Sequence, residues 1–366
     1  MSKLEKRDSN LDLLRIVSML LIVLIHSIDH SGVLEQAEVS SGAMYAYVRF
    51  TYALCQVCVN CYVMLSGYYL VNSKFHLKKL LTLWMEIAFY SFFLKLLFMI
   101  LGLQRFSFVS LASCLLPVLS GRYWFITIYV GLYLVFPFLN KLIHAMSRTE
   151  HLTLNLCLFA LFSLWISIFP GFAGMNSGGG WGLAWFVVLY LAAAWFRLYY
   201  TPKHSARTLI GAYIAIALLM TAALCVANRM GFGILQQLAS KQYRYDSVPV
   251  YLMTVALFVA FLNIRIKNAK VEKAACAVAP LTLGVYLIHA HANIFPWLWE
   301  TLDLPRYMDQ PWFPLLQMGC VFAIFLICIG IDAVRRATVG KLERANVLQR
   351  FCNAVTERAK KALERF

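Results

Sequence analysis

The chain has 366 residues, of which 61% are hydrophobic and 14% charged, and its formal net charge is +16 at pH 7. A soluble domain usually has about a quarter of its residues charged, so this composition excludes an ordinary soluble protein and indicates a membrane protein. The positive charge does not indicate nucleic acid as a partner, because the Lys and Arg residues collect on one side of the predicted membrane domain.

Long apolar runs recur along the chain and predict an all-α polytopic membrane protein, a bundle of about ten transmembrane helices. A helix needs about 20 apolar residues to cross the hydrocarbon core. No connection is long enough for a second folded domain, so we expect one transmembrane domain over residues 1–334. The predicted spans cover residues 11–28, 47–71, 77–101, 123–140, 152–169, 182–200, 208–227, 247–262, 277–295 and 312–333.

The longer connections are predicted to lie mostly outside, at residues 29–46, 102–122, 171–182, 228–246 and 296–311. They contain Gly, Tyr, Trp and Asp, which suit the mouth of a site for a polar substrate. The same composition fits slack connections between helices, and the sequence favours neither interpretation.

The distribution of basic residues predicts the orientation of the chain. With the N-terminus inside, 24 of the 33 Lys and Arg residues lie in inner segments and 7 in outer segments, while Arg15 and Lys95 fall within spans. This asymmetry is the positive-inside pattern, so both termini are predicted to be cytoplasmic. We expect the first apolar run to remain as a span rather than to be cleaved as a signal peptide, because it is long and contains charges.

Residues 335–366 are predicted to form a basic, amphipathic cytoplasmic tail. Leu348, Phe351, Val355 and Ala359 recur at spacings of three and four, so they share one face of a helix, and the other face is rich in Lys and Arg. Such a helix lies at the interface of an anionic leaflet and binds membrane lipids. It is expected to anchor the chain rather than to take part in catalysis.

The first span carries four ionisable residues, Asp12, Arg15, His26 and Asp29. Such groups are costly in hydrocarbon and usually mark a function. Arg15 and His26 are eleven residues apart, about three helical turns, so they share one face at roughly 16 Å along the axis. Each residue alone has a structural explanation, such as a snorkelling Arg15 paired with Asp12 or a packing histidine. Their common stripe favours a site for a long molecule threaded along the span.

A second polar stripe is predicted on the span at 277–295. Because this span enters from the inside, His289 should reach a depth similar to that of His26. Tyr286 lies one turn below His289, and Thr282 lies one turn below Tyr286. The two spans are therefore expected to bring two imidazoles to the outer half of the membrane domain.

Three further patterns have simpler explanations. The Ser66–Gly67 pair permits close approach of two helices. Trp124 begins an aromatic-rich span, and an aromatic belt at the membrane surface accounts for it. The CQVCVNC segment at 55–61 has metal-like spacing, but its three cysteines spread around a helix, so packing is the favoured role and no metal site is expected.

Several short motifs occur along the chain in a fixed order. They are RxxxLDxLR at 7–15, Arg15 with His26 ten residues between them, SGY at 66–68, FxxKK at 75–79, the WF…P segment at 124–137 and YLIH at 286–289. In these motifs the chain resembles the acyltransferase-3 family of integral membrane O-acyltransferases. The similarity extends over all the predicted spans.

The resemblance implies transfer of an acyl group, commonly acetyl, from cytoplasmic acyl-CoA to a hydroxyl of a cell-surface glycan or exopolysaccharide, or of its lipid-linked precursor. It also implies a multi-pass protein of the bacterial cytoplasmic membrane. Acetyl-CoA is then a donor substrate, and no permanently bound cofactor is expected. The acceptor, the acyl chain and the formation of a homo-oligomer are left open.

His26 is expected to remove the proton from the acceptor hydroxyl as that oxygen attacks the thioester, and a transiently acylated His26 is the alternative. Asp29 is expected to orient the His26 ring. Tyr286 and His289 are expected to stabilise the oxyanion or to bind the acceptor. The residues expected to bind acyl-CoA are Asp12, Arg15, Ser66, Lys78, Lys79 and Trp124, with Arg15, Lys78 and Lys79 on its phosphates.

Transport of a small amino acid or a glycan precursor is the alternative function, because buried Asp, Arg and His residues also suit ion-coupled transporters. Against transport, the sequence shows no inverted repeat and no paired helices broken by Gly or Pro. A purely structural membrane scaffold leaves the polar stripe of the first span unexplained.

Overall fold

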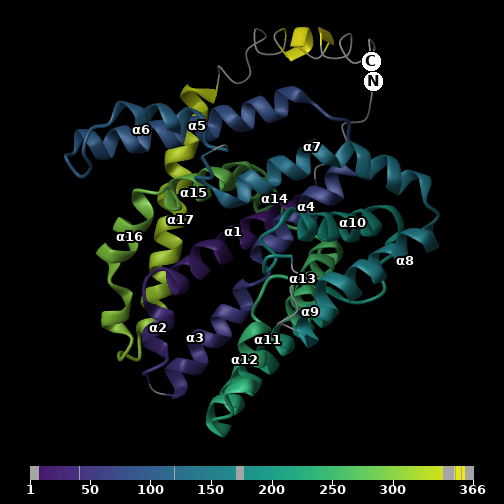
Figure 1. Cartoon of the computed structure of the whole chain (residues 1–366), viewed down its shortest axis with the longest axis vertical. Coiled ribbons are helices and arrows are strands. Elements are labelled where there is room, and N and C mark those ends of the chain that lie inside the picture. Colours follow the sequence, from purple (N-terminus) through teal and green to yellow (C-terminus); the bar gives the residue numbers. More distant parts are fainter. Residues whose placement is uncertain are drawn as a thin grey trace.

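The computed structural model describes residues 8–40, 42–118, 120–169, 177–340, 350, 352–355 and 357–358. Every regular element in these ranges is a helix, so the predicted all-α fold is confirmed. Figure 1 shows the helices crossing one another around α1 (Ser9–Asp29), with α5 (Leu77–Ile100) along one edge. Arg7 of the first motif, and Leu348, Phe351 and Ala359 of the predicted tail helix, lie outside the described residues.

Eight helical segments of the described residues are long and apolar enough to cross a membrane, whereas α10 (Leu183–Tyr199) and α13 (Val248–Asn263) are apolar but shorter. These segments correspond to the predicted spans, while the number of crossings stays a prediction. The eight are α1, α3–α4 (Gly42–Cys55 and Cys58–Leu70), α5, α7 (Trp124–Ala145), α8–η2–α9 (Arg148–Phe159, Ala160–Leu164 and Trp165–Ile168), α11 (Ala206–Met230), α14–η4–α15 (Ala269–Val278, Ala279–Leu281 and Thr282–His289) and α17 (Phe313–Thr338). Short helices in the connections are α2 (Val33–Ala37), α6 (Phe108–Ala112), η1 (Ser113–Leu115), α12 (Gly233–Lys241), α16 (Ile294–Leu302) and η5 (Leu304–Tyr307).

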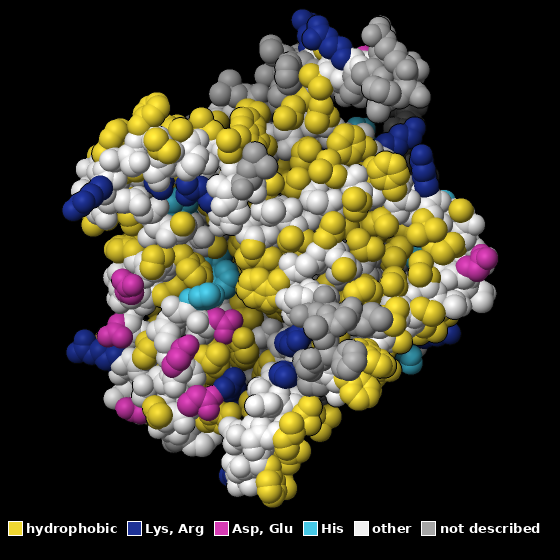
Figure 2. All heavy atoms as spheres, in the orientation of Figure 1, with side chains coloured by type: hydrophobic (Ala, Val, Ile, Leu, Met, Phe, Trp, Pro, Cys, Tyr) yellow, Lys and Arg dark blue, Asp and Glu magenta, His cyan; other side chains and the backbone are white. Residues whose placement is uncertain are grey.

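Helix α1 lies among many other helices of the bundle. Helices α3, α4, α13, α14, α15 and α17 all contact it. Leu14, Val23 and Ile28 are fully buried among them. Inside a bilayer the hydrophobic effect does not drive helices together, so close packing of this kind stabilises their association. The outer helices α11 and α17 instead expose large apolar side chains, and Figure 2 shows broad hydrophobic areas on one face of the molecule. This arrangement suits a multi-pass membrane protein surrounded by lipid.

Two predicted spans are interrupted. The span expected at 47–71 consists of α3 and α4, separated at Gln56 and Val57. The span expected at 277–295 begins earlier, as α14, passes through the 3-10 turn η4 and ends at His289. Pro280 lies in η4, where the missing N–H and the proline ring prevent a regular α-helix from continuing. The expectation of a single continuous helix is therefore wrong for both spans.

The contact between α4 and α10 depends on Gly67. A Cβ atom on this glycine would lie 2.7 Å from the carbonyl oxygen and 2.9 Å from the Cα atom of Tyr190. Backbone atoms cannot turn aside as a flexible side chain can, so the prediction that Gly67 permits close helix approach is confirmed. Asn140 of α7 joins the same helices, because its amide donates to the Leu70 carbonyl at 2.8 Å and accepts from the Tyr190 hydroxyl at 2.6 Å.

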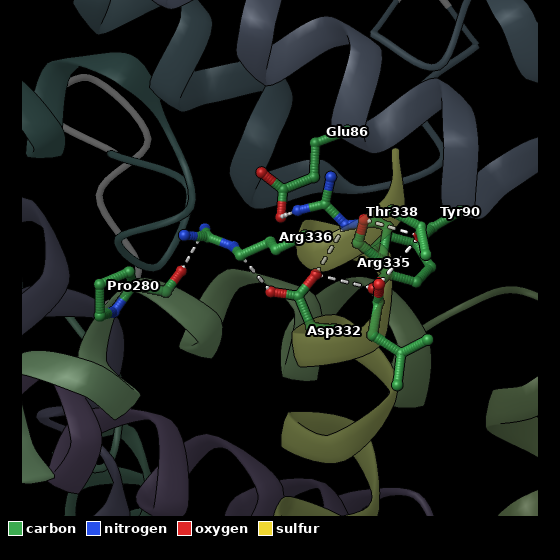
Figure 3. A network of polar contacts seen from close by, with 8 residues as sticks. Glu86, Tyr90, Pro280, Asp332, Arg335, Arg336 and Thr338 are labelled. Atoms are coloured by element: carbon green, nitrogen blue, oxygen red, sulfur yellow. Dashed lines mark hydrogen bonds and ion pairs between the residues drawn. The ribbon is translucent and has the colours of Figure 1, made fainter. Parts of the chain in front are cut away.

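Buried charges fasten α17 to α5, as Figure 3 shows. Arg335 lies 2.8 Å from Glu86 of α5 and 2.7 Å from Asp332. Asp332 also accepts a hydrogen bond from the Tyr90 hydroxyl at 2.8 Å. Removing one member of such a network leaves an unpaired charge buried in the bundle, which strongly destabilises the fold. The members of the network therefore stabilise the bundle together.

The network extends through Arg336 to η4. Arg336 lies 3.1 Å from Asp332 and donates to the carbonyl of Pro280. In a regular α-helix this carbonyl would accept a hydrogen bond from the backbone of the next turn. Helix α17 runs to Thr338, so both arginines belong to the bundle. Arg335 and Arg336, which the sequence assigned to the basic tail, are therefore held in α17 by Glu86 and Asp332, while the tail itself stays a prediction.

We expect Gly67→Ala to destabilise the bundle, because the added methyl group overlaps the backbone of Tyr190. Overpacking of this kind typically costs about 1–3 kcal/mol. Thermal unfolding of the protein in detergent, followed by size-exclusion chromatography, should show a lower midpoint than that of the wild type. Gly330→Ala is the matched control, since a Cβ atom on this α17 glycine meets nothing within 4 Å. Equal midpoints for the two variants would contradict the close helix contact.

Candidate active site

His26 of α1 and His289 of α15 are in direct contact, as their predicted depths required. His26 Nδ1 lies 2.9 Å from His289 Nε2, and His289 Nδ1 lies 2.5 Å from the carbonyl oxygen of Val285. A carbonyl oxygen only accepts hydrogen bonds, so His289 Nδ1 carries a proton and Nε2 of the neutral ring accepts one. The network then assigns the donated proton to His26 Nδ1, which leaves the lone pair of His26 Nε2 available for chemistry.

The His26 side chain lines an internal cavity of about 230 Å³, here called the reaction cavity. Tyr286, Trp124 and Asp29 line the same cavity. Trp124 stacks on Trp181 with ring centroids 4.4 Å apart, so it forms part of the cavity wall and the aromatic-belt explanation is incomplete. On the face shown in Figure 2, histidine side chains are visible in a hollow beside acidic ones.

Asp29 does not orient His26. Its Oδ2 accepts a hydrogen bond from the Tyr52 hydroxyl at 3.3 Å, and no hydrogen bond joins Asp29 to His26 in the described part of the chain. The His26 ring is bound instead by His289, 263 residues further along the chain. The prediction is wrong because helical spacing along α1 contains no information about a partner from another helix.

A second cavity, of about 350 Å³, adjoins the reaction cavity toward the N-terminal end of α1 and is here called the basic cavity. Three residues predicted to bind the donor line it, namely Arg15, Ser66 and Lys79. Three side chains, those of Tyr62, Phe125 and Leu283, line both the basic cavity and the reaction cavity. The two cavities are therefore neighbours along α1, and these three side chains separate them.

Two other residues predicted to bind the donor, Asp12 and Lys78, line neither the basic cavity nor the reaction cavity. Asp12 is buried and pairs with Arg15, with 3.4 Å between Oδ1 and Nη1, so it holds the guanidinium rather than lining the cavity. Tyr62 supports the same residue, because its hydroxyl donates to the Arg15 carbonyl at 3.1 Å. Lys78 precedes Lys79 in the first turn of α5 but lines neither the basic cavity nor the reaction cavity.

A third cavity, of about 540 Å³, adjoins the reaction cavity on its other side and is here called the mouth cavity. Asp29, Trp181 and Tyr245 line both of these cavities. The predicted outer loops at 171–182 and 228–246 supply much of the wall, so they shape a mouth rather than a slack connection, although residues 171–176 lie outside the described residues.

Three site residues carried no clear signal in the sequence. Tyr62 lies one turn before Ser66 on α4, and this spacing was the available indication that it shares the same face. Phe125 was one aromatic among many at the start of its span. Arg122 lines the reaction cavity, but a basic residue in a connection indicates topology before it indicates chemistry.

The fold and the site define a multi-pass membrane protein with three adjoining cavities, the middle one of which is lined by a histidine that is hydrogen-bonded to a second histidine. A family model described as an acyltransferase domain, that of acyltransferase-3, matches residues 8–331. The chain therefore belongs to this family and is a membrane acyltransferase. No curated protein and no solved structure matches the chain. The comparisons give no support to the transporter that the sequence left as an alternative.

We expect His289→Leu to slow acyl transfer about 10- to 100-fold with little change in KM, the loss typical of removing an orienting partner. The rate falls because Nδ1 of His26 loses the acceptor that fixes its tautomer. His289→Gln should recover part of the rate, since an amide oxygen can accept the same hydrogen bond. Initial rates at saturating donor measure both variants. A His289→Leu enzyme as fast as the wild type, or one no slower than His289→Gln, would contradict this role.

Proposed function

We propose that the protein transfers an acyl group, acetyl in the first instance, from cytoplasmic acyl-CoA to a hydroxyl of a surface glycan or of its lipid-linked precursor. The proposal places it in the bacterial cytoplasmic membrane. The observation that carries the proposal is the pair of adjoining cavities, with Arg15 and Lys79 lining one and His26 lining the other. A carrier with phosphates at one end and a reactive thioester on a long, thin arm fits such a pair of cavities.

The donor lies along α1 in this proposal. Arg15 binds a phosphate of CoA through its planar guanidinium, which Asp12 holds in place, while the Tyr62 hydroxyl donates to the backbone carbonyl of Arg15. The arm then passes Tyr62, Phe125 and Leu283 and brings the thioester to His26. The excess of Lys and Arg in the predicted inner segments supports a cytoplasmic position for the Arg15 end.

His26 is the general base in this proposal. Its Nδ1 is committed to His289, so Nε2 removes the proton from the acceptor hydroxyl as that oxygen attacks the thioester carbon. Collapse of the intermediate breaks the C–S bond, and the thiolate leaves with the proton from His26. The ester and free CoA are the products, and an acylated His26 is the competing mechanism.

The acceptor enters through the mouth cavity. Trp181, Tyr243 and Tyr245 offer aromatic surfaces there, while Asp29 and Arg244 offer charged, hydrogen-bonding groups. A mixture of flat apolar walls and a few polar groups suits a sugar, because the former provide contact and the latter fix orientation. This composition supports a glycan hydroxyl as the acceptor.

The function is tested by release of CoA. Purified protein in detergent or nanodiscs should release free CoA from acetyl-CoA when surface polysaccharide of the host is present, and the polysaccharide should gain acetyl ester. His26→Ala should lower this rate about 10²–10⁴-fold, the loss typical of a general base, while the protein stays monodisperse. Panels of acyl-CoA and acceptor identify the preferred pair. Equal CoA release by wild type and His26→Ala would refute the mechanism.

Arg15 should act on binding rather than on the chemical step, because it is remote from the thioester. We expect Arg15→Ala to raise the KM for acetyl-CoA with a smaller effect on kcat. Arg15→Lys should recover only part of the loss, since a point charge does not reproduce the planar fork. A residue that merely snorkels to the membrane surface would be replaced fully by lysine. Steady-state kinetics over a range of acetyl-CoA concentrations separate these outcomes.

A further inference from the structure

Arg122, in the turn before α7, places a guanidinium in the wall of the reaction cavity. One nitrogen is fixed, because Nη2 donates to the Ser113 hydroxyl at 2.7 Å and to the Ser110 carbonyl at 3.5 Å. Neither Nε, which is buried, nor Nη1 has a hydrogen-bond partner among the residues that the structure describes. An anchored cation with uncommitted N–H groups therefore borders the cavity that also contains His26.

The immediate surroundings of Arg122 are basic. His291 is buried nearby, and its burial, together with the positive charges of Arg122 and Lys95, lowers the pKa of His291 to about 4. No carboxylate in the described ranges forms an ion pair with Arg122. A guanidinium stays charged, and a partly buried cation without a counter-charge is costly. Such a cation is suited to a negative charge that arrives during the reaction.

His289 cannot supply the donor that an oxyanion needs. Its Nδ1 donates to Val285 and its Nε2 accepts from His26, so neither nitrogen has a free N–H group. The expectation that His289 stabilises an oxyanion is therefore wrong for this geometry. Arg122 is the cationic side chain that lines the reaction cavity, and arginine presents several N–H groups in one plane.

We propose that Arg122 is a catalytic residue that donates hydrogen bonds to the oxyanion formed during acyl transfer. This inference rests on the proposed function and adds a second reacting group to it. Donors that are fixed before the reaction stabilise a developing charge without reorganising, which makes them effective in a cavity with little water. The anchoring of Nη2 by Ser113 supplies this fixed position.

His26 takes the hydroxyl proton while the hydroxyl oxygen bonds to the carbonyl carbon. The electron pair of the C=O bond moves onto the carbonyl oxygen, where it meets the Arg122 N–H groups. When the pair returns, the C–S bond breaks and the thiolate takes the proton from His26. Arg122 itself gains and loses no proton.

The test compares variants of Arg122 by kcat, by KM for each substrate and by thermal midpoint. Arg122→Met keeps much of the length but no charge, and it should lower kcat about 10²–10³-fold with both KM values within about twofold. Arg122→Lys should lose about tenfold, because it keeps the charge but not the fork. Ser113→Ala should give a smaller loss of the same kind. Arg105→Gln, at an exposed position in the same connection, is the matched control and should match the wild type.

Two results would overturn the proposal. An unchanged kcat in Arg122→Met would do so, as would a raised KM for the acceptor at unchanged kcat, which would assign Arg122 to acceptor binding. If Arg122→Met does not fold, Arg122→Lys and Ser113→Ala decide, and wild-type kcat in both would refute the oxyanion role. Failure of the proposed function is distinguishable, because the wild type itself would then release no CoA from any acyl-CoA tested.

Discussion

The hydrogen bond between His26 Nδ1 and His289 Nε2 is the contact on which the site depends, because it joins α1 to α15 and fixes the tautomers of both rings. The series of hydrogen bonds begins at the carbonyl of Val285, passes through His289 and ends at the His26 ring, whose Nε2 is left available. A neutral imidazole thus takes the orienting place that a carboxylate occupies in many hydrolases. Within a membrane this substitution avoids a buried negative charge next to the base.

The position of α15 is itself held from α17. Gly284 precedes Val285 and packs directly on Asp332, since a Cβ atom there would lie 2.4 Å from Asp332 Cγ. Arg336 binds the carbonyl of Pro280, at the turn where α15 begins. The charged side chains of the ion network of Figure 3 line none of the three cavities, yet they place the helical turn that supplies Val285 and His289. Buried charge therefore stabilises the fold and the site through the same side chains.

Much of the architecture follows from the sequence, because a run of apolar residues long enough to cross a bilayer has few alternatives to a helix. Helical periodicity also placed Arg15 and His26 on one face, and the structure puts them in adjoining cavities. The partner of His26 could not be found in this way. Asp29 is near His26 along the helix, whereas His289 reaches it only through the packing of α15 on α1.

The positions of residues in the connections could not be predicted from sequence patterns either. Arg122 acquires its position from Ser113, in a short helical turn that no periodicity predicted. The break at Gln56 and Val57 lies in a run that reads as continuous helix, and the interruption at Pro280 was not predicted either. Long-range packing decides these features, so local propensity does not determine them.

Tyr62, Phe125 and Leu283 have a further consequence because they separate the basic cavity from the reaction cavity. In the proposed function the donor comes from one side of the membrane and the acceptor from the other, so the openings to the two sides must not join into a pore. Two aromatic rings and one aliphatic side chain carry no charge, and ions cross such an apolar contact only at high cost. A slender arm can part these side chains and fill the gap that it makes. The membrane would then keep its electrochemical gradient throughout turnover, because the bound donor itself would block the passage of ions.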